Sequence, residues 1–132
     1  MTGTVIYLYI YRLMMKVNLK ISIVNEDNKG FMGIGLVWLL RRIKKYRSIS
    51  RAAKDLNMSY VKALKILNCL EENLGRKMLI RERGGREHGG ARLTPFAEEF
   101  IEEYDRFQKD IKTYSERKFD SFQQKFLTGR IV

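Results

Sequence analysis

The sequence predicts a mainly α-helical fold with a small amount of β-structure, and three stretches carry this prediction. Residues 48–75 have the pattern of two helices joined by a tight turn. Residues 76–93 have the pattern of a β-hairpin around a Gly-rich loop, and residues 95–127 that of one long helix. A closely linked helix pair followed by a hairpin is typical of a winged helix-turn-helix. We therefore expect this fold with an N-terminal strand, a β-hairpin wing and a long C-terminal dimerisation helix.

Composition limits the class of protein. The 132 residues are enough for one domain with a core that needs no disulfide. Lys and Arg number 26 against 15 Asp and Glu, a net charge of +11, which favours nucleic acid or an anionic membrane surface as partner. The single cysteine, Cys69, can form no internal disulfide, and no apolar stretch is long enough for a membrane helix. We expect a cytoplasmic protein.

The N-terminal third predicts a strand, a turn and a helix. Residues 1–15 are expected to be an extension, and the translation start is left open between Met1 and one of the pair Met14 and Met15. Residues 17–23 alternate apolar and polar, the period of a half-buried strand. Residues 25–30 predict a turn, and residues 31–32 a short return strand. A helix is then expected to about Tyr46, with Leu and Ile on one side and Arg and Lys on the other.

Two serines mark the predicted helix pair. A first helix over residues 50–56 begins at the capping residue Ser50, and a second runs from Ser59 to Leu74, where Gly75 can end it. An apolar stripe is expected to pack inward from the second helix: Ala63, Leu67, Leu70 and Leu74. The residues expected to point outward near its start are Tyr60, Lys62 and Lys65.

The C-terminal helix is predicted from its cap and its aromatic repeat. Thr94 and Pro95 suit an N-cap and the first helical position. An apolar seam with a period of 3.5 residues follows: Phe100, Tyr104, Phe107, Ile111 and Tyr114. This period is that of paired helices, so we expect a homodimer; packing of the seam against its own domain is the alternative.

The charges are unevenly distributed. Residues 41–65 carry nine basic residues against one acidic, net +8, and residues 76–94 carry six against two, net +4. Residues 95–116 carry three against seven, net −4. The helix pair and hairpin are therefore expected to face DNA, and the distal helix to face elsewhere.

Motifs for catalysis or cofactor binding are lacking. The Gly-rich loop does not have the spacing of a phosphate-binding loop, and His88 is the only histidine. The Glu pairs at 98–99 and 102–103 are not accompanied by a Glu-x-x-His motif. We expect no enzyme activity, no cofactor and no metal, and His88 to be a solvated residue of the hairpin.

The segments SISRAAKDLNMSYVKALKILNCLEENLG and RKMLIRERGGREHGGARLT resemble the DNA-binding domain of the ModE family of molybdate-responsive regulators of bacteria and archaea. They are more distantly similar to the LysR-type winged helix. The likeness covers residues 16–107 and is carried by SIS-x-AAK-x-L, MSY and the ER-x-GG…GGA-x-LT hairpin. Two features depart from the family: Glu87 and His88 interrupt the Gly-rich tip, and 132 residues leave no room for molybdate-binding domains. Molybdate sensing is therefore not expected, nor is a small-molecule effector on this chain.

The resemblance implies roles for particular residues. Major-groove contacts would come from Ser59, Tyr60 and Lys62, with Lys65 on the same side. Phosphate contacts would come from Ser48, Ser50 and Arg51, and the charge distribution adds Arg41 and Arg42. The wing residues would be Arg81, Arg83, Arg86, His88 and Arg92.

The function expected from the sequence is sequence-specific binding of double-stranded DNA by a prokaryotic, nucleoid-associated transcriptional regulator. Residues 16–94 would be the DNA-binding domain, 95–127 the dimerisation helix and 128–132 a tail. Two alternatives are a winged helix that docks an acidic protein, and the DNA-binding half of a two-chain sensor whose effector domain is another polypeptide. The sequence does not specify the operator, the effector, or activation as opposed to repression.

Overall fold

The computed structural model describes residues 3–6, 15–82 and 90–128. The chain divides into two compact units, one formed by Ile21–Tyr104 and the other by Met1–Lys20 with Asp105–Val132. Of the predicted wing residues, Arg83, Arg86 and His88 lie outside the described residues.

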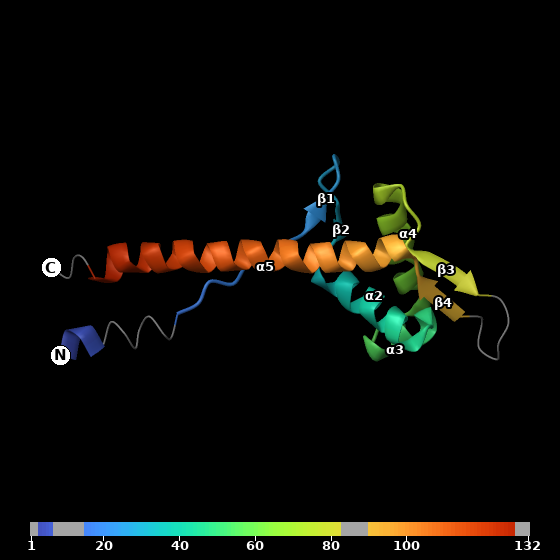
Figure 1. Ribbon diagram of the computed structural model, residues 1–132, viewed down its shortest axis with the longest axis horizontal. Helices are drawn as coiled ribbons and strands as arrows, with labels where there is room; N and C mark the ends of the chain where they lie inside the picture. Colours follow the sequence, from blue (N-terminus) through green and yellow to red (C-terminus); the bar gives the residue numbers. More distant parts are fainter. Residues whose placement is uncertain (1–2, 7–14, 83–89, 129–132) are drawn as a thin grey trace. The chain divides into compact units, whose positions relative to one another are not determined.

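The unit Ile21–Tyr104 contains the predicted winged helix (Figure 1). Its helices and strands follow in the order β1 (Ile23–Val24), β2 (Gly30–Met32), α2 (Ile34–Tyr46), α3 (Ile49–Asp55), α4 (Tyr60–Leu74), β3 (Leu79–Glu82), β4 (Gly90–Leu93) and the first part of α5 (Pro95–Gln123). The strands form two separate antiparallel pairs, β1 with β2 and β3 with β4. The mainly helical fold with a small hairpin is therefore confirmed.

The core of this unit lies where α2, α3, α4 and β4 meet. On α2 the predicted apolar side is buried, and on α4 the stripe residues Ala63, Leu67 and Leu70 are at most 1% exposed. Ala52 and Ala53 on α3 are equally buried, and their small side chains allow the neighbouring helices to approach closely. The stripe predicted from helical spacing is thus the inward side of α4.

The two helices of the motif are fixed by serine caps. Ser59 Oγ accepts a hydrogen bond from the Lys62 N–H at 3.1 Å, and Gly75, at φ +65°, ends α4. The first cap was predicted wrongly. Ser48, not Ser50, accepts from the Arg51 N–H at 3.2 Å. A start at Ile49 is favoured because it places Ile49, only 4% exposed, in the core.

The N-terminal strand was also predicted too long. Residues 15–22 form no strand, and only Ile23–Val24 pairs with β2. Because β2 has just three residues, its backbone groups cannot form strand hydrogen bonds with the rest of the alternating stretch, residues 17–22. The turn is as predicted, with Asn25 Oδ1 accepting from the Asp27 and Lys29 N–H groups at 3.0 Å each.

The hairpin and the start of α5 are joined at Thr94. Strands β3 and β4 pair from Leu79 opposite Leu93 to Glu82 opposite Gly90. Thr94 Oγ1 accepts from the Ala97 N–H at 3.1 Å and donates to the Lys77 carbonyl at 2.8 Å. The predicted cap is confirmed, and it also ties the start of α5 to the segment that leads into β3.

The predicted dimer seam is divided between the units. In Ile21–Tyr104, Tyr104 is only 4% exposed, and Phe100 packs against the same core. In the other unit, Phe107 and Tyr114 on α5 are about half exposed and Ile111 is half-buried. That unit also contains a helical turn at residues 3–6 and the π-helix Gln124–Thr128. Phe100 and Tyr104 thus pack within their own domain, which was the alternative to a dimer interface.

Within the described part of the chain, no helix has the length and apolar character needed to cross a membrane.

Candidate nucleic-acid interface

The N-terminal ends of α3 and α4 and the base of the β3–β4 hairpin meet around one shallow depression. Its lining includes Ser48, the N-cap of α3, Ser50 from α3, Tyr60 from α4 and Arg81 from β3. The Tyr60 hydroxyl accepts a hydrogen bond from Arg81 Nη1 at 3.4 Å. Four of the predicted site residues, widely separated in sequence, therefore form one continuous surface.

The hairpin is held against the helices through the backbone. The Ala91 N–H donates to the Arg47 carbonyl at 3.0 Å, and Arg47 ends α2 in the left-handed conformation at φ 52°. A Cβ on Gly90 would lie 3.3 Å from the same carbonyl oxygen and 3.0 Å from Glu82 Oε2. Glycine at position 90 thus permits the close approach of β4 to the end of α2.

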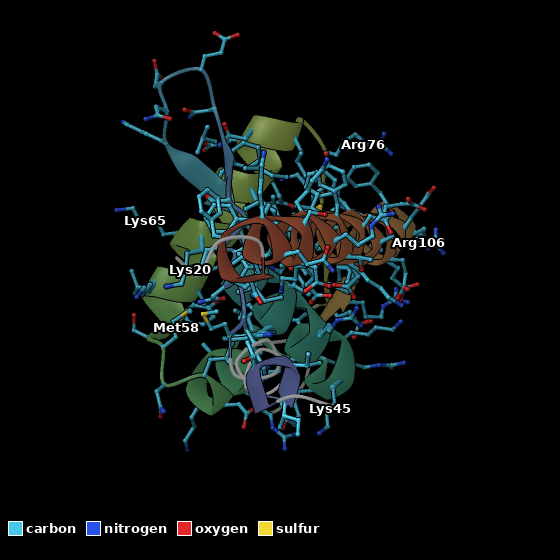
Figure 2. All side chains as sticks on the ribbon, turned by 90° about the vertical axis from the view of Figure 1, so that its left-hand side faces the viewer. Lys20, Lys45, Met58, Lys65, Arg76 and Arg106 are labelled. Carbon is cyan, nitrogen blue, oxygen red and sulfur yellow. The ribbon has the colours of Figure 1, made fainter. Side chains whose placement is uncertain are left out.

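The first two turns of α4 present the predicted recognition residues. Ser59, Lys62 and Lys65 are exposed and Tyr60 is 39% exposed. Figure 2 shows Lys65 extending away from α4. The prediction that Tyr60, Lys62 and Lys65 point outward is confirmed, and their contacts with DNA stay a prediction.

Val61 is a surface residue that the sequence-based prediction missed. Its side chain is 74% exposed, well above the 39% of its neighbour Tyr60. Position 61 lies two residues before the stripe residue Ala63, which turns it to the opposite side of the helix. That spacing was the available signal, because an apolar residue opposite a buried stripe must face solvent or a partner.

The predicted phosphate-binding cations are not equivalent. Arg51 stacks over the ring of Tyr46 with 5.2 Å between its guanidinium carbon and the ring centroid, and Lys45 lies over the same ring at 5.2 Å. Arg42 instead pairs with Asp55, with Nε 2.6 Å from Oδ2, and its Nη1 donates to the Trp38 carbonyl at 3.3 Å.

Arg92 is likewise paired, with Glu82 on the neighbouring strand. The guanidinium groups of Arg42 and Arg92 are thus engaged by carboxylates of the protein itself. Arg41 is exposed on α2.

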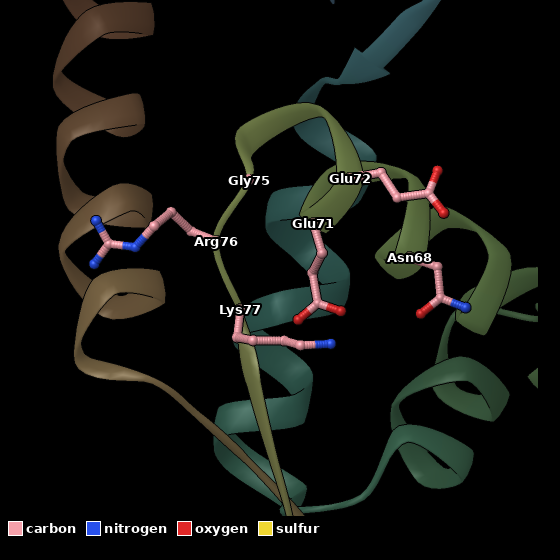
Figure 3. A pocket seen from close by; sticks show the side chains of 6 residues that line it. All are labelled: Asn68, Glu71, Glu72, Gly75, Arg76 and Lys77. Carbon is pink, nitrogen blue, oxygen red and sulfur yellow. The ribbon is translucent and has the colours of Figure 1, made fainter.

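A second hollow, of about 260 Å³, lies at the opposite end of α4 (Figure 3). Glu71 there accepts a hydrogen bond from the Met78 N–H at 2.7 Å. Figure 3 shows Arg76 pointing toward α5, where its guanidinium carbon lies 4.3 Å from the centroid of the Phe96 ring. The first contact joins α4 to the residue before β3, and the second joins the segment after α4 to α5.

The comparison with known families agrees with this geometry. Residues 36–98 match the family described as bacterial regulatory helix-turn-helix protein, lysR family. This part of the chain is therefore similar to the LysR-type helix-turn-helix family. The match runs from α2 through α4 and the hairpin to the first residues of α5, and so contains the whole surface described above.

Two curated relatives and one solved structure are similar to the chain. The transcriptional regulator ModE of Haemophilus influenzae is 36% identical over 73 residues, which are 55% of this chain and 29% of that protein. The molybdenum-pterin-binding protein MopB of Rhodobacter capsulatus is 34% identical over 83 residues, 63% of this chain and 31% of that protein. The chain therefore spans about a third of the length of these relatives.

The crystal structure of a CbnR_DBD–DNA complex has the same fold, with a TM-score of 0.51 and 22% identity. It covers 68% of this chain and 98% of that one. The resemblance expected from the sequence, ModE-like and more distantly LysR-like, is confirmed.

Proposed function

We propose that the chain is a transcriptional regulator that binds double-stranded DNA sequence-specifically, with the N-terminal half of α4 in the major groove. The observation that carries the proposal is the convergence of α3, α4 and the wing base on one surface, joined by the Tyr60–Arg81 hydrogen bond. In a helix-turn-helix this end of the second helix contacts base edges. The LysR-type family match over the same residues supports it.

Base readout is assigned to the exposed residues of the first two turns of α4. Lys62 and Lys65 can donate to guanine O6 and N7, and the Tyr60 hydroxyl can donate or accept. The exposed methyl groups of Val61 suit an apolar contact with a thymine methyl. A mixture of donors and an apolar group on one helix face provides a basis for distinguishing A·T from G·C pairs.

Affinity that is independent of sequence is assigned to the cations around that face. Arg51 and Arg41 would contact phosphates, and Ser50 lies beside Arg51 at the start of α3. Arg81 would approach the backbone from the wing base. Arg42 and Arg92 would each have to leave a carboxylate partner before contacting a phosphate.

A homodimer completes the proposal. Phe107 and Tyr114 are about half exposed on α5 and supply apolar surface for a second copy. A two-fold dimer would present two α4 helices to successive major grooves and would favour a palindromic site. Sedimentation at micromolar protein giving only monomer would contradict this part. A chromosomal partner would also place the protein in the cytoplasm.

Selection of bound duplexes from random DNA, followed by affinity measurements at several salt concentrations, tests the function. The proposal predicts an enriched motif with two-fold symmetry and an affinity that falls steeply with salt, since binding releases counterions from phosphates. No enrichment over the starting pool would contradict it. Enrichment of single half-sites would contradict the dimer alone.

A further inference from the structure

A hollow of about 540 Å³ lies between the β1–β2 hairpin, the start of α2 and the exposed side of α4. Its volume falls within the range of about 300–1,000 Å³ that is usual for small-molecule sites. It is distinct from the depression shared by α3, α4 and the wing, since only α4 contributes to both, and with different residues.

The lining of this hollow is apolar below and cationic at its mouth. Met32 and Leu36 are buried, and Phe31 and Ile66 are half-buried and packed against the core. The exposed side chains of Lys62 and Lys65 also line it, and Figure 2 shows Lys65 extending outward from α4.

The only charged groups among the described lining residues are these two lysines. The hollow at the other end of α4 differs, because its lining contains both acidic residues, Glu71 and Glu72, and basic ones, Arg76 and Lys77. An apolar ligand that carries a negative charge would therefore complement this lining.

We propose, against the expectation from the sequence that this chain has no small-molecule effector, that this hollow binds a small amphipathic carboxylate. The hydrocarbon part would cover Phe31, Leu36 and Ile66, and the carboxylate would pair with Lys62 and Lys65. Burial of the hydrocarbon supplies affinity, and the charge-assisted hydrogen bonds to two ammonium groups select an anion. A neutral or cationic molecule of the same length would lose the second contribution.

The position of the two lysines gives the site a regulatory consequence, which rests on the proposed DNA-binding function. Lys62 and Lys65 belong to the face assigned to base readout, and a bound carboxylate neutralises them. The ligand and DNA would then compete for the same two ammonium groups. Ligand binding would weaken DNA binding, and DNA would weaken ligand binding by the same factor.

Cys69 provides a reporter that needs no DNA. It is the only cysteine of the chain, it is partly exposed, and it lines the hollow. The rate of its alkylation by iodoacetamide, a neutral reagent, can be followed by intact-protein mass spectrometry. With octanoate as the probe at ten times its dissociation constant, alkylation should slow about tenfold, because only the unoccupied protein reacts.

Two compounds and two protein variants serve as controls. Octylammonium has the same chain with the opposite charge, acetate has the charge without the chain, and neither should slow alkylation at the same concentration. Lys65→Gln should weaken octanoate binding about fivefold or more. Lys77→Gln, an equal loss of charge at an exposed position away from this hollow, should leave it unchanged.

Amide NMR spectra give a second readout that does not depend on thiol reactivity. Octanoate should shift resonances of β2, the start of α2 and residues 62–69. Unchanged spectra together with an unchanged alkylation rate would overturn the proposal. Equal protection by octylammonium would also overturn it, because the charge would then play no part.

Measurements with a DNA duplex selected by the wild-type protein test the carboxylate site and the proposed DNA-binding function independently of each other. Octanoate should raise the dissociation constant for DNA in the wild type and have a smaller effect in Lys65→Gln. Octanoate binding without any DNA binding would refute the proposed function and leave the carboxylate site standing. DNA binding that octanoate does not alter, although octanoate occupies the hollow, would refute the competition.

Discussion

The ion pair between Arg42 and Asp55 allows a structural role of a basic residue to be separated from a role in DNA binding. Arg42 Nε lies 2.6 Å from Asp55 Oδ2 and joins α2 to the last turn of α3. The two side chains are 33% and 44% exposed, so solvent screens their attraction. A coupling free energy of about 0.5–1 kcal/mol is expected for such a pair.

A double-mutant cycle with Arg42→Ala, Asp55→Asn and the combined variant measures this coupling in urea unfolding. The loss of stability in the single Asp55→Asn variant is smaller than the coupling free energy. The helix dipole disfavours a carboxylate in the last turn of a helix, so removing this carboxylate also stabilises the protein by about 0.3–1 kcal/mol. The cycle cancels that contribution. We expect the double variant to be less destabilised than the two single changes added together.

Binding to random DNA at several salt concentrations tests the other role. Arg51→Ala should reduce the slope of log affinity against log salt by about 1, as expected for the loss of one phosphate contact, and Arg42→Ala should leave it nearly unchanged. An equal reduction by both variants, with no coupling in the unfolding cycle, would refute the assignment of Arg42 to structure.

Three further substitutions test separate parts of the structure. Val61→Ala should weaken binding to the selected site severalfold without changing the unfolding midpoint, since Val61 is 74% exposed; equal weakening on random DNA would argue against a base contact. Gly90→Ala should destabilise the protein by about 1–3 kcal/mol through crowding against the Arg47 carbonyl, and a neutral effect in urea unfolding would show that the hairpin adjusts. Tyr114→Glu should shift a dimer to monomer in sedimentation while the helical circular dichroism is retained, and an unchanged sedimentation coefficient would exclude that part of α5 from the interface.

Local chemical signals allowed much of the fold to be predicted. The caps at Ser59 and Thr94, the end of α4 at Gly75 and the buried stripe of α4 each depend on residues within one or two helical turns. The prediction of the α3 cap was wrong because residues 48–50 are Ser-Ile-Ser, and the local sequence is compatible with a cap at either serine. Burial of Ile49 decides between them, and burial depends on distant parts of the chain.

The errors and omissions at the site share this dependence on tertiary structure. Alternation over residues 17–23 indicated a strand, but a strand forms only where another strand pairs with it. The pairing strand β2 is three residues long, so most of the stretch has none. The pairing of Arg42 with Asp55 spans 13 positions and requires α2 to pack on α3. The dimer seam on α5 was predicted from its period, and a period alone could not show that Phe100 and Tyr104 pack within the domain.

The most direct test of the central claim is a parallel selection from random DNA with the wild type, Tyr60→Ala and Arg51→Ala. If the start of α4 reads bases, the wild type and Arg51→Ala will enrich the same motif, the latter with weaker affinity at every sequence. Tyr60→Ala will then lose its preference at particular base pairs within each half-site. An unaltered motif from Tyr60→Ala, or an equal loss of motif in both variants, would contradict the assignment of base readout to α4.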